Sequence, residues 1–209
     1  MDDVSDPEFW NSRYLSGTTP WDFGGVPGDL KSYLRRRLKY PCPPRTDRGH
    51  VFIPGCGSGY EARIFADAGF KVTAIDIAPA AIERTSKLVE GMPQVTVING
   101  DVFRHEFPEA SFDVVYERTF LCAISPKLRK SYRDRVARLL KHGGQFVGYF
   151  YYEKTNPADG PPFGLAWGEG DRLFSLHFLL TRDDPVADSL PVFAGHERWQ
   201  ERRRTGHEA

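Results

Sequence analysis

Three glycines within one short segment are the first feature whose spacing could serve chemistry. Gly55, Gly57 and Gly59 follow a short apolar run and precede a segment of helical character. A glycine has no Cβ, so the backbone can turn tightly there and a ligand can approach it closely. Because such a loop also occurs as a simple tight turn, the residues that follow it along the chain decide how it is interpreted.

Two carboxylates follow at positions that suit an adenosine ligand. Asp76 ends the next apolar run after the glycines, and Asp101 ends the one after that. A carboxylate at the first position can accept hydrogen bonds from ribose hydroxyls, and one at the second can accept from an adenine amino group. The alternative is that both acids are helix caps or solvated loop residues. The predicted cofactor contacts at these two turns are Asp76, Ile77, Asp101, Val102 and Phe103.

The spacing of the glycines discriminates between adenosine cofactors. A dinucleotide site has the pattern Gly-x-Gly-x-x-Gly, whereas here the third glycine comes one position early and Tyr60 follows it. A Walker-type phosphate loop needs a lysine that this segment lacks. The pattern Gly-x-Gly-x-Gly suits S-adenosylmethionine, which has no phosphate and yields S-adenosylhomocysteine. A nicotinamide-dependent dehydrogenase remains the alternative if the ligand is a dinucleotide.

Alternating strands and helices must position these residues. Short β-branched apolar runs alternate with segments of helical periodicity, which is typical of a parallel sheet with helices on both faces. The predicted strands are 50–53, 71–75, 95–98, 112–116 and 145–152, and the predicted helices are 28–39, 61–68, 79–90 and 126–140.

The end of the chain departs from this alternation. A loop rich in proline and glycine at 156–168 precedes two segments, 174–180 and 197–204, that are predicted to pair as an antiparallel hairpin. The predicted fold class is therefore α/β, Rossmann-like and doubly wound, with a mostly parallel seven-stranded sheet that ends in an antiparallel hairpin. Residues 49–209 form the predicted methyltransferase domain. Residues 1–48, irregular and rich in aromatics, form a lid segment of the same single domain.

Four segments carry a resemblance to a known family. They are Thr-Pro-Trp-Asp at 19–22, Pro-Gly-Cys-Gly at 54–57, the stretch 112–124, and Gly-Pro-Pro-Phe at 160–163. Through them the chain resembles the thiopurine methyltransferase superfamily, which includes thiol and halide methyltransferases, over roughly residues 9–203. The resemblance implies an S-adenosylmethionine-dependent methyltransferase whose small-molecule acceptor is a thiol or a thiopurine-like sulfur.

The resemblance also implies a role for aromatic side chains near the N-terminus. In the plant thiol and halide branch, aromatics in this region cover the cofactor, and the matching positions here are Trp10, Tyr14 and Trp21. Tyr14 stands where that branch usually has Trp. Aromatic faces attract a cation such as a sulfonium. The alternative is that these rings only pack the N-terminal segment against the core.

Arg118 matches a position that is Arg in the thiopurine branch and usually Tyr in the plant halide branch. The resemblance implies that it touches the cofactor and can reach the substrate. Its neighbours at 119–124 look more like the thiol and halide branch, so the acceptor class stays open. The alternative is a surface ion pair with Glu117 or Asp113.

Methyl transfer to sulfur needs no enzyme nucleophile, so Cys56 and Cys122 are predicted to be packing residues. A thiol acceptor must lose its proton, although a thiolate formed in water needs no base. The lid is expected to combine the N-terminal aromatics with 160–163. A wide apolar pocket lined by Phe120, Phe163 and Trp167 would favour an aromatic thiol, whereas a small polar pocket would favour a halide or hydrosulfide. The candidate bases are Tyr116, Glu117, Asp22 and Tyr151, and the predicted catalytic set is Arg118, Tyr116 and Asp22.

The composition of the chain indicates which kinds of binding partner to expect. Lys+Arg and Asp+Glu both number 28, so net charge gives no reason to expect nucleic acid or an anionic membrane. No apolar run approaches the roughly 20 residues that span a bilayer. Neither the cysteines nor the scattered histidines have metal-ligand spacing, and an acidic N-terminus does not fit a targeting peptide. We expect a cytoplasmic monomer or weak homodimer. The alternatives are a halide or small-metabolite N- or O-methyltransferase, or a non-catalytic S-adenosylmethionine-binding module.

Overall fold

A single seven-stranded sheet organises the computed structural model, which describes residues 4–38, 47–153 and 160–206. The strand order is β3-β2-β1-β4-β5-β7-β6. Strands β3 to β5 in this order are parallel, while β7 runs antiparallel to both of its neighbours. The strands are β1 (His50–Pro54), β2 (Lys71–Asp76), β3 (Val95–Asn99), β4 (Phe112–Arg118), β5 (Leu140–Tyr151), β6 (Phe178–Pro185) and β7 (Glu197–Arg204).

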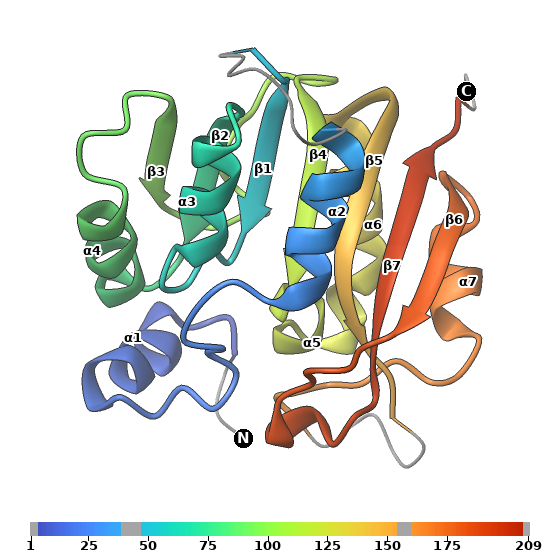
Figure 1. Cartoon of the computed structure of the whole chain (residues 1–209). Helices are drawn as coiled ribbons and strands as arrows, with labels where there is room; N and C mark the ends of the chain where they lie inside the picture. The colour runs from blue at the N-terminus through green and yellow to red at the C-terminus, as the bar shows by residue number, and fades with distance from the viewer. Residues whose placement is uncertain (1–3, 39–46, 154–159, 207–209) are drawn as a thin grey trace.

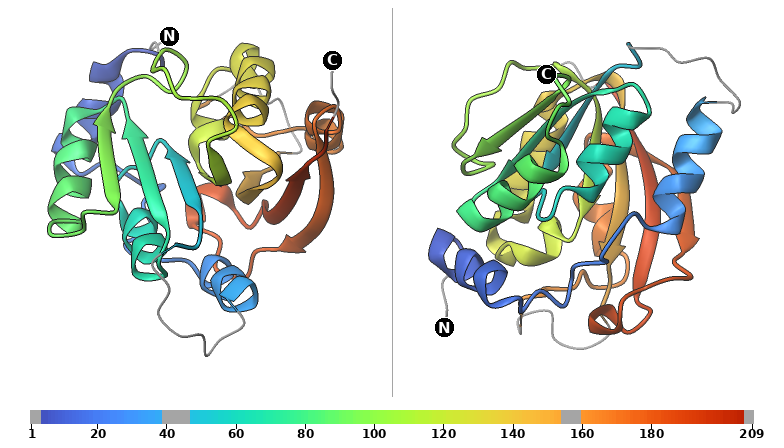
Figure 2. Two further views of the ribbon diagram at one scale, coloured as in Figure 1. Left: turned by 90° about the horizontal axis from the view of Figure 1, so that it is seen from above. Right: turned by 60° about the vertical axis from the view of Figure 1, so that its left-hand side comes forward.

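Helices cover both faces of the sheet, as Figure 2 shows in the view from above. One face carries α2 (Gly28–Leu38), α3 (Tyr60–Asp67) and α4 (Pro79–Leu88), and the other carries α6 (Arg129–Leu139) and α7 (Glu169–Phe174). Side chains alternate along β1 accordingly, since Val51 and Ile53 pack towards α2 and α3 while Phe52 packs towards α6. The predicted doubly wound fold with its final hairpin is confirmed.

The N-terminal segment contains a helix that the sequence pattern did not reveal. Helix α1 (Pro7–Ser16) begins after Asp6, whose side chain accepts from the N–H of Glu8, and ends at Gly17 in the left-handed conformation. These are ordinary helix start and stop signals. The expectation of an irregular segment was wrong because Tyr14 is the helix's single buried residue, which leaves no apolar period to detect.

Two other boundaries differ from expectation. Residues 126–140 form a 3-10 turn, η1 (Pro126–Leu128), then α6, and Leu140 already belongs to β5. At the far end, Phe174 ends helix α7 and strand β6 starts at Phe178 instead of at 174. The sequence predicts that 174–180 is extended from its start, but Phe174 belongs to a helix, from which it packs against Phe146. The predicted end of the helix 28–39, at Lys39, lies outside the described residues.

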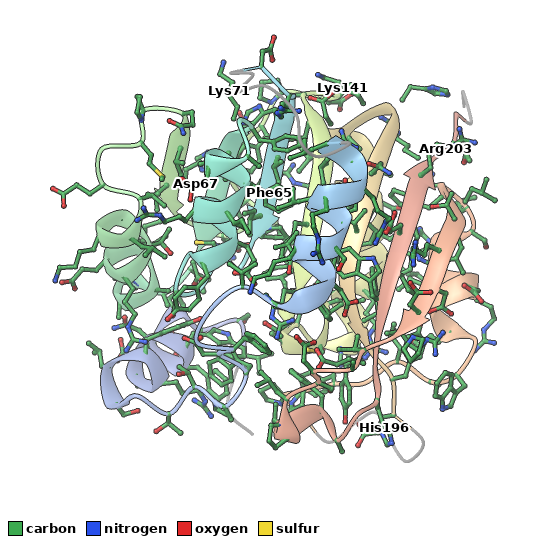
Figure 3. The ribbon with its side chains drawn as sticks, in the orientation of Figure 1. Phe65, Asp67, Lys71, Lys141, His196 and Arg203 are labelled. Atoms are coloured by element: carbon green, nitrogen blue, oxygen red, sulfur yellow. The ribbon has the colours of Figure 1, made fainter. Side chains whose placement is uncertain are left out.

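The parallel strands all point towards one edge of the sheet. In Figure 1 this is the lower edge, where α1 and the short helix α5 (Phe120–Ala123) lie. Figure 3 shows Lys71 and Lys141 at the opposite, upper edge, and His196 at the lower one. Within the part of the chain that the structure describes, no helix has the length and apolar character to cross a membrane. Ligand sites in open α/β sheets lie beyond the carboxyl ends of the strands, so a ligand site is expected at the lower edge.

Candidate functional site

A cavity of about 660 Å³ opens at this carboxyl edge. Its wall is built by the glycine loop, the turns after β2 and β3, the segment after β4 and the N-terminal segment. A second, smaller cavity of about 50 Å³ lies against the glycine loop. The two cavities share four lining residues, which are Tyr14, Trp21, Gly55 and Thr119. They therefore form adjoining parts of one site.

The glycine loop lies between the two cavities. Gly55 and Gly57 both have positive φ, and a Cβ on Gly55 would come within 2.7 Å of the Phe120 ring. A Cβ on Gly57 would lie 3.0 Å from the hydroxyl of Tyr14. Gly59, the third predicted contact, lines neither cavity. It precedes helix α3 at φ +80°, where a Cβ would clash with Thr85.

Asp76 joins the glycine loop to the end of β2. Its carboxylate lies in the wall of the larger cavity and accepts the N–H groups of Gly57 at 3.0 Å and Ala78 at 2.9 Å. Burial raises the pKa of this carboxyl, and the N–H groups of Ala78 and Gly57 oppose that effect. A carboxylate offers about four acceptor positions. Acceptor positions that the backbone N–H groups leave open could serve a ligand's hydroxyl group. Ile77 lines the same cavity beside it.

The turn after β3 closes the cavity next to Asp76. Asp101 accepts the N–H of Phe103 at 2.7 Å and lies 3.4 Å from the side chain of Arg104. Val102 is buried and Phe103 packs against Phe120 across the wall, with ring centroids 6.2 Å apart. The structure thus brings the predicted residues of both turns to one cavity, and the local turn role of Asp101 coexists with its place in the wall.

The three predicted aromatics all line the larger cavity. Trp21 forms edge-to-face contacts with Trp10 at 5.5 Å and with Tyr14 at 6.1 Å. This cluster packs on Ala78 and Ala81, directly after Asp76. The N-terminal segment is therefore both a packed core and a wall of the site, so the two interpretations offered for these rings do not exclude each other.

The three predicted catalytic residues lie in the smaller cavity. Asp22 accepts the hydroxyl of Ser58 at 2.6 Å, and Tyr116 is fully buried with its pKa raised by burial. The Arg118 side chain is 10% exposed, pairs with Glu61 at 3.7 Å, and lies over the Tyr149 ring at 4.4 Å. One guanidinium nitrogen, Nη1, is buried without a hydrogen-bond partner in the described structure. The alternative of a surface pair with Glu117 or Asp113 was wrong.

Glu117 points to the opposite face from Arg118. Its carboxylate accepts the N–H of Leu121 at 2.9 Å and the hydroxyl of Tyr132 at 2.5 Å. Burial raises the pKa of Glu117 to about 7. The Tyr132 ring packs against Phe120, whose own ring lines the larger cavity. Glu117 therefore supports the cavity wall from beneath and lines neither cavity.

The remaining wall of the larger cavity is mostly apolar and was only partly foreseen. Phe120 lines it as expected, whereas Phe163 and Trp167 do not: Phe163 donates its N–H to the carbonyl of Cys122, and Trp167 stacks on Tyr152. Sequence patterns gave no sign of Phe193, which follows a loop between the hairpin strands. The wall comprises Phe120, Cys122, Ala123, Ile124, Ser125, Lys127, Leu128, Pro161, Pro162, Val192 and Phe193.

Cys56 and Cys122 are buried, as expected for packing residues. Burial raises the pKa of both thiols, which disfavours the nucleophilic thiolate. Cys42 lies outside the described residues. Tyr151, another candidate base, lines neither cavity. No group of three potential metal ligands occurs among the residues that the structure covers.

Comparison with known families places this geometry in context. The family model described as thiopurine S-methyltransferase (TPMT) matches residues 5–205. The probable thiol methyltransferase 2 of Arabidopsis thaliana is 29% identical over 167 residues, which is 78% of this chain and 70% of that protein. The thiopurine S-methyltransferase of Vibrio campbellii is 26% identical over 184 residues, or 82% of each chain.

Solved structures share the fold at lower identity. The 1,6-didemethyltoxoflavin-N1-methyltransferase of Burkholderia thailandensis, crystallised with bound 1,6-didemethyltoxoflavin and S-adenosylhomocysteine, superposes with a TM-score of 0.75. It is 20% identical and covers 96% of this chain and 87% of its own. The N-methyltransferase NodS of Bradyrhizobium japonicum, bound to S-adenosylhomocysteine, has a TM-score of 0.68 at 15% identity and covers 86% of this chain and 87% of its own.

Proposed function

Because the chain belongs to the thiopurine S-methyltransferase family, we propose that it transfers the methyl group of S-adenosylmethionine to the sulfur of a small thiol or thiopurine-like acceptor. The observation that carries the proposal is the position of Asp76. Its buried carboxylate holds the glycine loop at Gly57 and still faces the larger cavity. That arrangement brings together the glycine loop and the carboxylate at the end of the next strand, which are the two elements that an adenosine cofactor needs.

The residues around Asp76 fit the adenosine part of the cofactor. Asp76 would accept the ribose hydroxyls, and Asp101 would accept from the adenine amino group. Ile77, Val102 and Phe103 supply apolar surface for the ring. Gly55 lets the ligand approach the backbone where a side chain would meet Phe120. The role of Gly59 would be to form the turn and admit Thr85, without direct contact.

The smaller cavity fits the amino-acid end of the cofactor. Arg118 has a buried nitrogen that lacks a partner in the described structure, and a carboxylate placed there would satisfy it. Asp22 lies in the same cavity and would accept from an ammonium group. Tyr116 packs beneath them, and its fully buried hydroxyl does not favour a role as a base. We thus assign Arg118 and Asp22 to cofactor binding.

The N-terminal segment would act as a lid over the reacting centre. Tyr14 and Trp21 line both cavities and Trp10 lines the larger one, so the sulfonium would lie beside these rings. Their rings would stabilise its positive charge and exclude water. We propose that residues 1–48 and 49–209 form one domain, since this segment packs directly on helix α4.

The chemistry requires alignment more than acid–base catalysis. When bound, S-adenosylmethionine supplies a methyl group on a positively charged sulfur; the acceptor's sulfur lone pair forms the new S–C bond while the old C–S pair stays with the departing thioether. None of Tyr116, Glu117 or Tyr151 lines the larger cavity, so the acceptor would enter as a thiolate already ionised in water. The walls then hold the two reactants in line, a contribution of several kcal/mol.

A halide acceptor is the principal alternative, and the wall residues argue against it. Residues such as Phe120, Ile124, Leu128 and Phe193 offer apolar surface that a small hydrated anion would not use. A thiol with an apolar body would bury that surface. We further propose that the enzyme acts in the cytoplasm as a monomer or weak homodimer, without a nucleic-acid or membrane partner, as its balanced charge suggests.

The test combines ligand binding with turnover. S-adenosylhomocysteine should raise the melting temperature of the wild-type protein, and Asp76→Ala should remove most of that shift. NADH serves as the control ligand and should give no shift. Methyl transfer is then assayed with thiophenol, 6-mercaptopurine and iodide. Methylation of iodide but of neither thiol would overturn the acceptor assignment, and absence of any shift with S-adenosylhomocysteine would overturn the cofactor site.

A further inference from the structure

We propose that Lys127 selects acceptors that carry an anionic group in addition to the attacking sulfur. This inference rests on the proposed function and specifies its acceptor class. Lys127 lies in the 3-10 turn η1, directly after helix α5, and forms part of the wall of the larger cavity. Lys127 is exposed as well as lining the cavity, so it belongs to the rim.

Lys127 differs from the other charged residues that line this cavity. Arg13 donates to the carbonyl of Phe9 and lies over its ring, and Arg104 pairs with Asp101. Asp76 accepts backbone N–H groups. For Lys127, in contrast, the described structure shows neither a hydrogen bond nor an ion pair. Apolar ligand pockets commonly orient their ligand with a few charged or polar groups, and an unpaired lysine at the rim can do so for an anion.

The surroundings of Lys127 define the rest of the acceptor. Ile124 and Leu128, its neighbours in the chain, line the same cavity, as do Phe120 and Phe193 from other segments. An apolar or aromatic body would bury itself against these side chains, while a carboxylate at its far end would meet the ammonium. A lysine suits this task because its flexible stem lets a point charge follow ligands of different length.

The acidic groups nearby do not compete for this position. Asp76 and Asp101 are the acidic residues that line the cavity, and both belong to the turns after β2 and β3. Lys127 belongs to the segment after β4, and no ion pair joins it to either carboxylate in the described structure. We therefore infer that the acceptor is a thiol on an apolar body that bears a carboxylate.

The experiment compares two acceptors that differ only in this charge. The value of kcat/KM is measured for 4-mercaptobenzoate and for 4-mercaptobenzamide, in the wild type, Lys127→Gln and Lys127→Glu. Lys130→Gln is the matched control, because Lys130 is an exposed lysine on α6 that lines neither cavity. The readout is the ratio of the two kcat/KM values, which cancels any general loss of activity.

We expect the wild-type ratio to favour the carboxylate. Lys127→Gln should lower the ratio about fivefold, the size expected for an exposed ion pair, and Lys127→Glu should lower it further. High salt should weaken the wild-type preference, because the pair is exposed, while Lys130→Gln should keep the wild-type ratio. Equal ratios in the wild type and Lys127→Gln would overturn the role of Lys127. Failure of the wild type to methylate either thiol would instead overturn the proposed function.

Discussion

The side-chain oxygen of Asn11 lies 3.0 Å from the backbone nitrogen of Ala80 and accepts its hydrogen bond. Helix α1 thereby satisfies an N–H at the start of helix α4, which has no side-chain cap of its own. Because α4 follows Asp76 directly, this contact connects the N-terminal segment to the part of the sheet edge that would hold the ribose. Arg84 adds a second link from α4 to the carbonyl of Tyr14.

Replacement of Asn11 should therefore loosen the lid. We expect Asn11→Ala to weaken S-adenosylhomocysteine binding about fivefold, since about 1 kcal/mol of hydrogen-bond energy is lost from the closed form. Isothermal titration calorimetry measures the affinity, and limited proteolysis near residue 17 reports lid opening. Ser12→Ala, on the same helix, is the control, because Ser12 contacts only its own helix. An affinity equal to that of Ser12→Ala would show that the contact does not hold the lid.

Substitutions of Gly59 and Gly91 by alanine allow the cost of backbone strain to be distinguished from the cost of a steric clash. Both have φ near +80°, but a Cβ on Gly59 would meet Thr85 at 2.7 Å, whereas Gly91 has open space around it. We expect Gly91→Ala to lower the free energy of unfolding by about 1 kcal/mol from backbone strain, and Gly59→Ala by about 3 kcal/mol because overpacking is added. Urea denaturation measures both. Equal losses would mean that Thr85 moves aside without cost.

The buried pair of Arg118 and Glu61 allows stability to be separated from binding. Arg118→Leu leaves Glu61 as a buried, unpaired carboxylate and should destabilise the fold by about 3 kcal/mol. Adding Glu61→Gln should recover much of that loss, because the uncompensated charge is gone. Affinity for S-adenosylhomocysteine should stay low in both variants, as neither can bind the carboxylate end of the ligand. Recovery of affinity in the double variant would exclude a direct role for Arg118.

Glu117 should make stability depend on pH. Its pKa is raised by burial to about 7 in the fold, above the usual value near 4.3 of an unfolded chain. The folded state therefore binds the proton more tightly, and the resulting stabilisation is complete below about pH 4 and is lost as pH rises to about 7.

Comparison with Glu117→Gln isolates this contribution. Over the same pH interval the wild type should lose about 3 kcal/mol relative to the variant. The measurement is the free energy of unfolding in urea at several pH values for both proteins. Parallel pH curves would show that Glu117 does not titrate in this range.

The sequence alone predicts a feature correctly where the cause of that feature lies within one short segment. Gly55 and Gly57 need no distant partner to form a turn, and Asp76 ends a short, largely apolar strand, so the loop and the acid at the strand end followed from the chain alone. The doubly wound sheet with its antiparallel end was predictable for the same reason. Strands and helices have different periods of apolar residues, so their order can be followed along the sequence.

Tertiary structure decided the contacts between residues that lie far apart in the chain. That Asn11 caps α4, that Arg118 faces Glu61 and turns from Glu117, and that Phe193 joins the wall with Pro161 all follow from how the layers pack. A side chain's partner there is set by the path of the backbone between the two residues, which no short-range pattern encodes. The sequence by itself determined the glycine loop and the fold class, and packing decided how the N-terminal segment, the apolar wall and Lys127 surround the larger cavity.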